Sequence, residues 1–170
     1  MGDLGEKRNL LLAGFDLLLS ELVESVKGHY GPRLVSIAAF GSVARRTPGP
    51  LSDLDVLVVA DELPSGRLRR VEQFEPVEAA LAGRLESLKE AGLHTRLSPV
   101  LRTPNEIEQY GGPIFLDMTE HVLILHDRGR FLSNYLGRLR SRLAAQGARR
   151  LTYRGACYWD LGSGGGDHDR

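Results

Sequence analysis

Two acidic residues at the start of an apolar run have the spacing of a metal-binding pair. Asp53 and Asp55 are separated by one residue and are followed by Val56–Ala60. Side chains two apart on a β-strand point to the same face, about 7 Å apart at the backbone. Two like charges this close repel unless a cation lies between them, and Mg²⁺ commonly binds one or two carboxylates together with phosphate oxygens. We therefore predict that Asp53 and Asp55 are catalytic residues that bind one or two Mg²⁺ ions.

A second motif, Gly41-Ser42, follows the apolar run Leu34–Phe40. A glycine at the end of a strand lets the backbone approach a ligand closely. The next N–H groups and the Ser42 hydroxyl could then bind a triphosphate, and a helical turn starting at Val43 would add further N–H groups. Arg45 would add positive charge. Either motif alone is common in ordinary turns and caps, but together they predict a metal–triphosphate site with Gly41, Ser42 and Arg45 as nucleotide-binding residues.

The hydrophobic pattern predicts the elements that position these residues. Leu11, Phe15, Leu18, Leu22 and Val26 recur three and four apart, as on one face of a helix over residues 5–29. Two more helices are expected, one from an N-cap at Ser65 to about residue 91 and one over 131–145, and a short one should start at the capping box Thr103–Glu106. Short apolar runs predict strands at 34–40, 53–60, 93–102 and 121–125.

The connections between these elements predict an α+β fold. The loop between the first two strands is too short for a crossover helix, so these strands should be antiparallel, whereas helices join the later ones. We expect a mixed sheet of about four strands, backed by helices on one side. Residues 1–161 should form a single domain and residues 162–170 a flexible tail. An extended segment over 148–161, with Tyr158-Trp159 as a core anchor, should dock on this domain.

Composition excludes some classes of protein. The 170 residues contain 22 Lys and Arg and 22 Asp and Glu, so the net charge is zero and nucleic acid is not expected as the main ligand. Polar residues interrupt the N-terminal leucines before the roughly 20 apolar residues that a membrane span needs. The single cysteine, Cys157, cannot form an internal disulfide. We expect a cytoplasmic protein without membrane contact, and a homo-oligomer remains open.

The segments FGSVARR (40–46) and SDLDVLV (52–58) together resemble the signature of the DNA polymerase beta-like nucleotidyltransferases, above all the minimal nucleotidyltransferases of prokaryotes. The resemblance implies the nucleotidyltransferase fold and Mg²⁺-dependent transfer of a nucleoside monophosphate, with AMP from ATP as the expected case, to a hydroxyl of a protein or small molecule. Gly41 and Ser42 match the phosphate-binding positions, and Asp53 and Asp55 match the metal ligands. Many minimal members act as antitoxins beside a HEPN-type ribonuclease, so a HEPN-type partner is a further expectation.

Two positions depart from the family pattern. Arg46 replaces a glycine, which is tolerable if its backbone stays at negative φ. A third acid, expected on the next core strand, has no match because residues 93–102 contain no carboxylate. Their polar face offers His94, Arg96 and Ser98. Other residues that could take the role have structural interpretations that we favour: His94 as a structural histidine, Glu106 in a capping box, and Asp127 as a cap or turn residue. Asp117 is a further acid near the fourth strand.

Three functions are therefore open. The first is an active nucleotidyltransferase. The second is a weakened or inactive antitoxin that binds and neutralises a HEPN-type partner. The third, antibiotic modification, is weaker because such enzymes usually carry a second domain. C-terminal arginines form a basic stripe, which we interpret as a solvated face in preference to a partner or RNA contact: Arg138, Arg140, Arg142, Arg149, Arg150 and Arg154.

Overall fold

A computed structural model describes residues 3–153 and 156–160, and its centre is a four-stranded mixed sheet. The strands are β1 (Leu34–Ala39), β2 (Leu54–Ala60), β3 (Leu97–Arg102) and β4 (Leu123–Asp127), in the order β3-β2-β1-β4. β1 pairs antiparallel with both β2 and β4, and β2 pairs parallel with β3. This confirms the predicted mixed sheet and the antiparallel first pair. The predicted tail at 162–170 lies outside the described residues.

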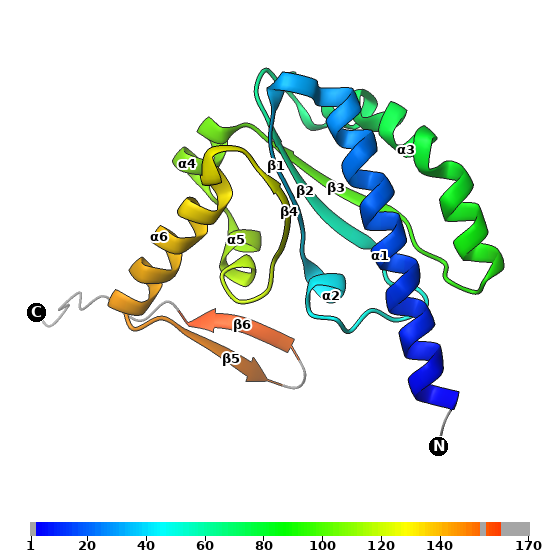
Figure 1. The fold of residues 1–170 in the computed structure, drawn as a ribbon. Coiled ribbons are helices and arrows are strands. Elements are labelled where there is room, and N and C mark those ends of the chain that lie inside the picture. Colours follow the sequence, from blue (N-terminus) through cyan, green and yellow to red (C-terminus); the bar gives the residue numbers. More distant parts are fainter. Residues whose placement is uncertain (1–2, 154–155, 161–170) are drawn as a thin grey trace, which may run out of the picture.

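Two long helices cover one face of the sheet (Figure 1). They are α1 (Asp3–Tyr30) and α3 (Arg67–Glu90). Phe15, Leu18, Leu22 and Val26 of the predicted stripe are all buried against sheet residues such as Val56 and Val58. The burial of this face, at roughly 25 cal/mol per Å² of apolar surface, holds α1 on the sheet. α3 begins after Gly66, so the expected N-cap at Ser65 is wrong: Gly66 has φ +89 and the helix start has no side-chain cap.

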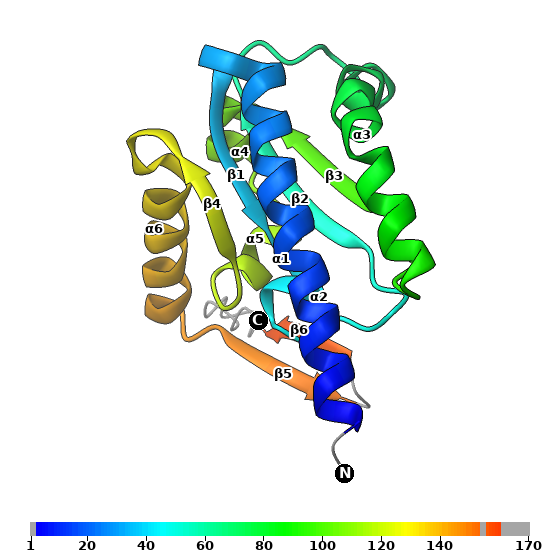
Figure 2. The same cartoon turned by 45° about the vertical axis from the view of Figure 1, so that its right-hand side comes forward.

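The opposite face is also covered by helices, which corrects the expectation of helices on one side only. These are α4 (Pro104–Tyr110), α5 (Pro113–Met118) and α6 (Phe131–Ala145). Ile107, Phe115 and Leu132 form a second core cluster with Leu57 and Val59 of β2. Alternate residues of β2 therefore face two separate cores, which explains its unbroken apolar sequence. In Figure 2, α1 crosses in front of the sheet and α4 and α5 lie behind it.

Some boundaries moved and others held. Residues 93–96 of the expected third strand precede β3, and β4 starts two residues later than expected. The capping box at Thr103–Glu106 is formed, and α6 spans the predicted residues 131–145.

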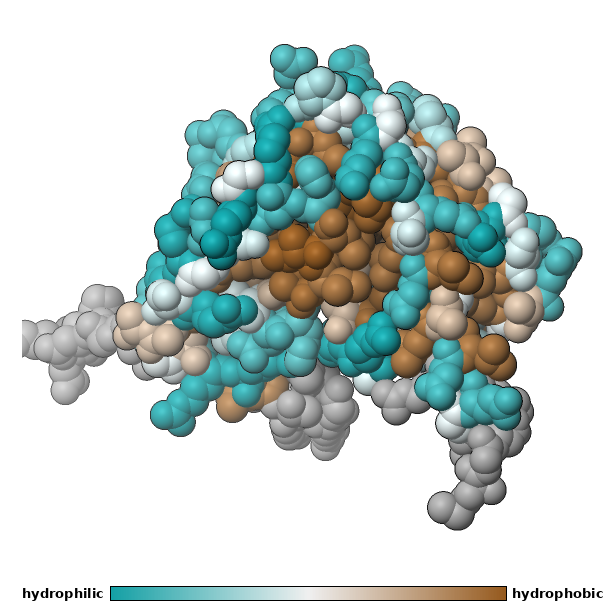
Figure 3. All heavy atoms as spheres, viewed as in Figure 1, coloured by the Kyte–Doolittle hydropathy of each residue, from teal (hydrophilic) through white to brown (hydrophobic). Residues whose placement is uncertain are grey.

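β4 lies at the edge of the sheet and its Leu123 side chain is 36% exposed. Figure 3 shows an apolar band across the middle of this view. Among the helices of the described ranges, none is long and apolar enough to span a membrane.

A short hairpin follows α6, formed by β5 (Arg149–Tyr153) and β6 (Ala156–Asp160). Trp159 is partly buried against the second core cluster, and its Nε1 donates a hydrogen bond to Asp117 at 3.3 Å. The segment docks on the domain as predicted, in the form of a hairpin; Trp159 is only partly buried, and the Tyr158 side chain lies outside the described residues. The basic stripe is not simply solvated: Arg140 donates to the Thr119 carbonyl and Arg150 lies 3.9 Å from the Asp117 carboxylate. Arg154 lies outside the described residues.

Candidate active site

The turn after β1 brings Gly41 into direct contact with the Asp55 side chain. The Phe40 N–H donates to the Asp55 carbonyl at 3.1 Å, which ties the end of β1 to the start of β2. Gly41 has φ +68, and a Cβ added there would overlap Asp55 Oδ2 and lie 3.3 Å from its Cγ. Only glycine therefore fits, both for its backbone conformation and for the close approach of the carboxylate. The structure brings together the two motifs that the sequence placed twelve residues apart.

A single helical turn, α2 (Gly41–Ala44), starts at Gly41, two residues earlier than expected. The first N–H groups of a helix have no intrahelical acceptor, so those of Gly41 and Ser42 lie at the open end of the turn. The Ser42 hydroxyl makes no hydrogen bond to any residue in the described ranges. Arg45 follows the turn, is exposed, and lies close enough to Asp55 for its charge to lower the pKa of that carboxyl.

Arg46 has φ +57, so the condition of a negative φ, under which its replacement of the glycine would be tolerable, is not met. A non-glycine residue in the left-handed region costs roughly 1–2 kcal/mol, and the family's glycine would avoid that cost. The Arg46 guanidinium donates to Asp16 on α1 at 2.9 Å. This contact joins the loop to the first helix, although an exposed ion pair returns less than about 1 kcal/mol.

Asp55 lies in a partly buried setting with charges of both signs around it. Burial raises the pKa of its carboxyl above the usual value, and the negative charge of Asp53 raises it further. A hydrogen bond from the Ser98 side chain and the charge of Arg45 act in the opposite direction. The net effect is a raised pKa. A carboxyl in this state gains strongly from a nearby cation, because the cation favours its charged form.

Ser98 occupies the strand position beside Asp55. The parallel register of β2 and β3 pairs Asp55 with Ser98 and Leu54 with Leu97. Ser98 and Val100 therefore face the same side of the sheet as Asp55, whereas Leu97 and Leu101 pack into the first core cluster. A neutral hydroxyl thus stands next to Asp55 on the strand where the family pattern places its third acid.

Asp53 lies just before β2 and is paired with Arg96. The two guanidinium–carboxylate distances are 3.3 and 3.4 Å. Arg96 is 82% exposed and Asp53 39%, so solvent screens the pair and its contribution to stability is small. Arg96 and Ser98 are the residues of this site that the sequence did not select. Their strand alternation was visible, but their partners followed only from the register of the parallel pair.

The other acids considered for the third position are engaged elsewhere. Glu106 accepts both guanidinium N–H groups of Arg70 at 2.8 Å and closes its capping box. Asp127 accepts from the N–H groups of Leu132 and Ser133 at the start of α6, and Asp117 bonds Trp159. These contacts agree with the structural interpretations of Glu106 and Asp127. His94 is exposed, and only its backbone hydrogen bond, to the Pro50 carbonyl, is defined.

The donor set suits a magnesium ion that is shared with a triphosphate. Within the described ranges there is no cluster of three or more His, Cys, Asp or Glu side chains that could bind a metal alone. Two neighbouring carboxylates, Asp55 on β2 and Asp53 just before it, beside an open helical turn, match a cation that completes its shell with phosphate oxygens and water. Burial, and to a lesser extent the charge of Asp53, raises the pKa of Asp55, and a divalent cation at this place would favour the charged carboxylate.

The chain is similar to several known proteins. The chain is 32% identical over 124 residues to a Methanocaldococcus jannaschii protein named "Putative protein adenylyltransferase MJ1305", covering 72% of this chain and 79% of that protein. Solved structures include a toxin–antitoxin with AMP-PNP (TM-score 0.49, 16% identity, 76% of this chain and 92% of that one). Another is a tri-AMPylated Shewanella oneidensis HEPN toxin with an MNT antitoxin (TM-score 0.44, 14% identity, 78% and 92%). Residues 19–130 match the model of the nucleotidyltransferase domain, and the chain belongs to this family.

Proposed function

We propose that this chain binds a nucleoside triphosphate with Mg²⁺ and transfers a nucleoside monophosphate, AMP from ATP, to a hydroxyl of a protein or small-molecule acceptor. The observation that carries the proposal is the Asp55 carboxylate held against Gly41, with Asp53 two residues before it. This contact supports a metal-binding role for the pair, beside the open turn that would receive the phosphates. Family membership supports the reaction class.

Each residue has a role that follows from its position. Asp53 and Asp55 would hold one or two Mg²⁺ ions, which when bound would offset charge on the attacking and leaving oxygens. Gly41 and Ser42 would bind the triphosphate through backbone N–H groups and the hydroxyl, and Arg45 would add positive charge. Arg96 is exposed enough to leave Asp53 and pair with a phosphate oxygen. Ser98 would fix the orientation of the Asp55 carboxylate.

Label transfer tests this proposal. The chain is incubated with ATP labelled at the α-phosphate, Mg²⁺ and candidate acceptors. We expect transfer that falls at least about a hundredfold in Asp55→Asn, because a displaced metal ligand costs about that much in rate. Glu72→Gln is the matched control, since it makes the same acid-to-amide change on the exposed side of α3. Transfer that is unchanged in Asp53→Asn plus Asp55→Asn would overturn the proposal.

A second candidate function is a binding module that neutralises a HEPN-type ribonuclease partner with weak or no turnover. The specific observation in its favour is Ser98 beside Asp55, on a strand without a carboxylate. Neutralisation in cells that express the partner tests this role, with binding measured in parallel. If Asp53→Ala abolished neutralisation while binding persisted, a binding role alone would be excluded and the catalytic role would stand.

A further inference from the structure

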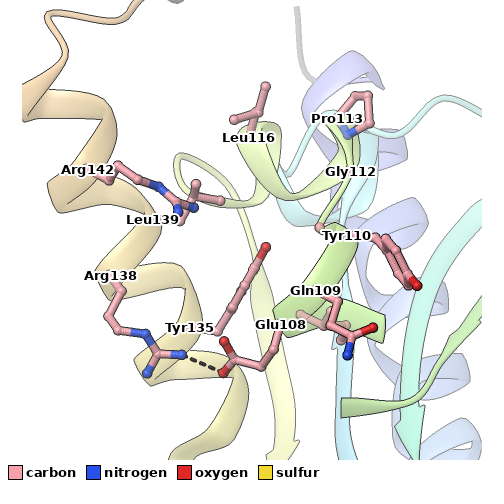
Figure 4. Close-up of a pocket in the computed structure, with 12 residues that line it drawn as sticks. Glu108, Gln109, Tyr110, Gly112, Pro113, Leu116, Tyr135, Arg138, Leu139 and Arg142 are labelled. Carbon is pink, nitrogen blue, oxygen red and sulfur yellow. Dashed lines mark hydrogen bonds and ion pairs between the residues drawn. The ribbon is translucent and has the colours of Figure 1, made fainter. Parts of the chain in front are cut away.

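A cleft between α6 and the α4–α5 turn has the features of a second ligand site. Its volume is about 560 Å³, within the 300–1,000 Å³ usual for small-molecule sites. None of the residues that line it belongs to the candidate active site. Figure 4 shows side chains of α6 on one side of the cleft and those of α4 and α5 on the other. It therefore needs an explanation that nucleotide transfer does not supply.

One face of α6 builds a wall of this cleft. Tyr135, Arg138, Leu139 and Arg142 are spaced by three and four residues, so they lie on the same side of the helix. Arg138 is bonded to Glu108 across the cleft at 2.5 Å. Arg142 is exposed and forms no ion pair with any residue of the described ranges. The two arginines and Glu108 leave a net charge of about +1 at the cleft, which favours a single negative charge.

The Tyr135 ring is largely buried, and its hydroxyl points into the cleft (Figure 4). The Tyr135 side chain is 7% exposed, and its ring packs edge-on against Phe115 at 5.2 Å between centroids. A Cβ added to Gly111 would lie 2.9 Å from the hydroxyl oxygen, so the hydroxyl stands directly against the turn. Among the described residues it makes no hydrogen bond. Burial raises its pKa, so the hydroxyl is a neutral donor at neutral pH. This donor is therefore available to an oxygen atom of a ligand in the cleft.

The remaining wall is apolar. Pro113 and Leu116 face Leu139 across the opening, with the exposed ring of Tyr110 nearby. A lone inorganic ion would leave most of this volume to water. We propose that the cleft binds a small molecule with one oxyanion group on an apolar body, the oxyanion bonded to Arg142 and the Tyr135 hydroxyl and the body lying against Leu116 and Leu139.

Two matched dyes test the proposal. Anilinonaphthalene sulfonate carries one sulfonate on an apolar body, and N-phenyl-1-naphthylamine is the same body without the charge. Fluorescence titration of the full chain should show one sulfonate-dependent site. The Arg142→Gln variant should weaken binding of the sulfonate dye about tenfold or more, as expected for a lost bond to a charged group, and leave the neutral dye unchanged. The Tyr135→Phe variant should weaken binding of the sulfonate dye severalfold.

The Arg69→Gln variant is the matched control, because it removes the same charge from an exposed position of α3 outside the cleft. Thermal melts followed by circular dichroism confirm that the variants fold. Equal affinity of wild type and Arg142→Gln for the sulfonate dye would overturn the proposal, as would equal affinity of the wild type for the two dyes. The Asp53→Asn plus Asp55→Asn variant should bind the sulfonate dye like the wild type. If this double variant lost dye binding, the dye would bind at the nucleotidyltransferase site, and the proposal of a ligand site in the cleft would be overturned.

Discussion

Replacing Gly41 with alanine should displace the Asp55 carboxylate while leaving the fold intact. An alanine in the left-handed conformation costs about 1–2 kcal/mol, and the less flexible unfolded chain returns about 0.4–1 kcal/mol. At Gly41 the new Cβ would also overlap Asp55 Oδ2, so the carboxylate must leave its rotamer at a further cost of about 1 kcal/mol. We expect Gly41→Ala to lower the free energy of unfolding by about 2 kcal/mol.

Two controls separate these costs. Gly147 has φ +67, almost the same as Gly41, and a Cβ there would meet nothing within 4 Å. The Gly147→Ala variant therefore measures backbone strain alone, at about 1 kcal/mol or less. In an Asp55→Ala background the overlapping atoms are gone and only Cβ remains, at 3.5 Å.

Urea unfolding of wild type, Gly41→Ala, Asp55→Ala and the double variant completes a thermodynamic cycle. The coupling between the two positions should be about 1 kcal/mol, and Mn²⁺ affinity, with Mn²⁺ standing in for Mg²⁺, should fall in Gly41→Ala but not in Gly147→Ala. A coupling energy near zero would refute the contact between Gly41 and the carboxylate as the source of the effect. Unchanged Mn²⁺ affinity would refute its role in positioning a metal ligand.

Two other side chains carry predictions about stability. Asp127 accepts four hydrogen bonds, from the buried Ser36 hydroxyl and from N–H and hydroxyl groups at the start of α6, so Asp127→Ala should cost about 2–4 kcal/mol in urea unfolding. A cost below 1 kcal/mol would contradict this. The second side chain is Glu106. Its hydrogen bonds with Arg70 lower the pKa of the Glu106 carboxyl from 4.5 to about 2, so the stabilisation is complete above pH 4.5 and is lost as pH falls toward 2. The free energy of unfolding of the wild type should exceed that of Glu106→Gln by about 1–2 kcal/mol at pH 7, after allowance for solvent screening, and by much less at pH 2.5. A difference that does not change with pH would contradict the lowered pKa.

Local patterns predicted most elements of the fold because their causes are local. The stripe from Phe15 to Val26, the capping box at Thr103 and the 131–145 helix all depend on neighbours within a few residues. The second helical layer was missed although β2 is apolar on both faces. Such a run indicates burial on two sides, but which elements cover each face depends on long-range packing.

The candidate site was predicted in part for the same reason. Gly41, Asp53 and Asp55 stand in two segments that an antiparallel pair brings together, and that pairing followed from the short loop. Ser98 and Arg96 depend on the register of β2 with β3, a parallel pair separated by the whole of α3. The left-handed backbone of Arg46 had no signal in its residue type, since arginine there breaks the usual preference.

The bond between Phe40 and Asp55 also has a consequence for the order of folding. It closes a loop of 15 residues, whereas the pairing of Asp55 with Ser98 closes one of 43. The longer closure costs about 0.9 kcal/mol more in chain entropy and requires α3 to be in place. We therefore expect the β1–β2 hairpin to bring Gly41 and Asp55 together early in refolding. The contacts of Ser98 and Arg96 would form only when the slower parallel pairing is complete.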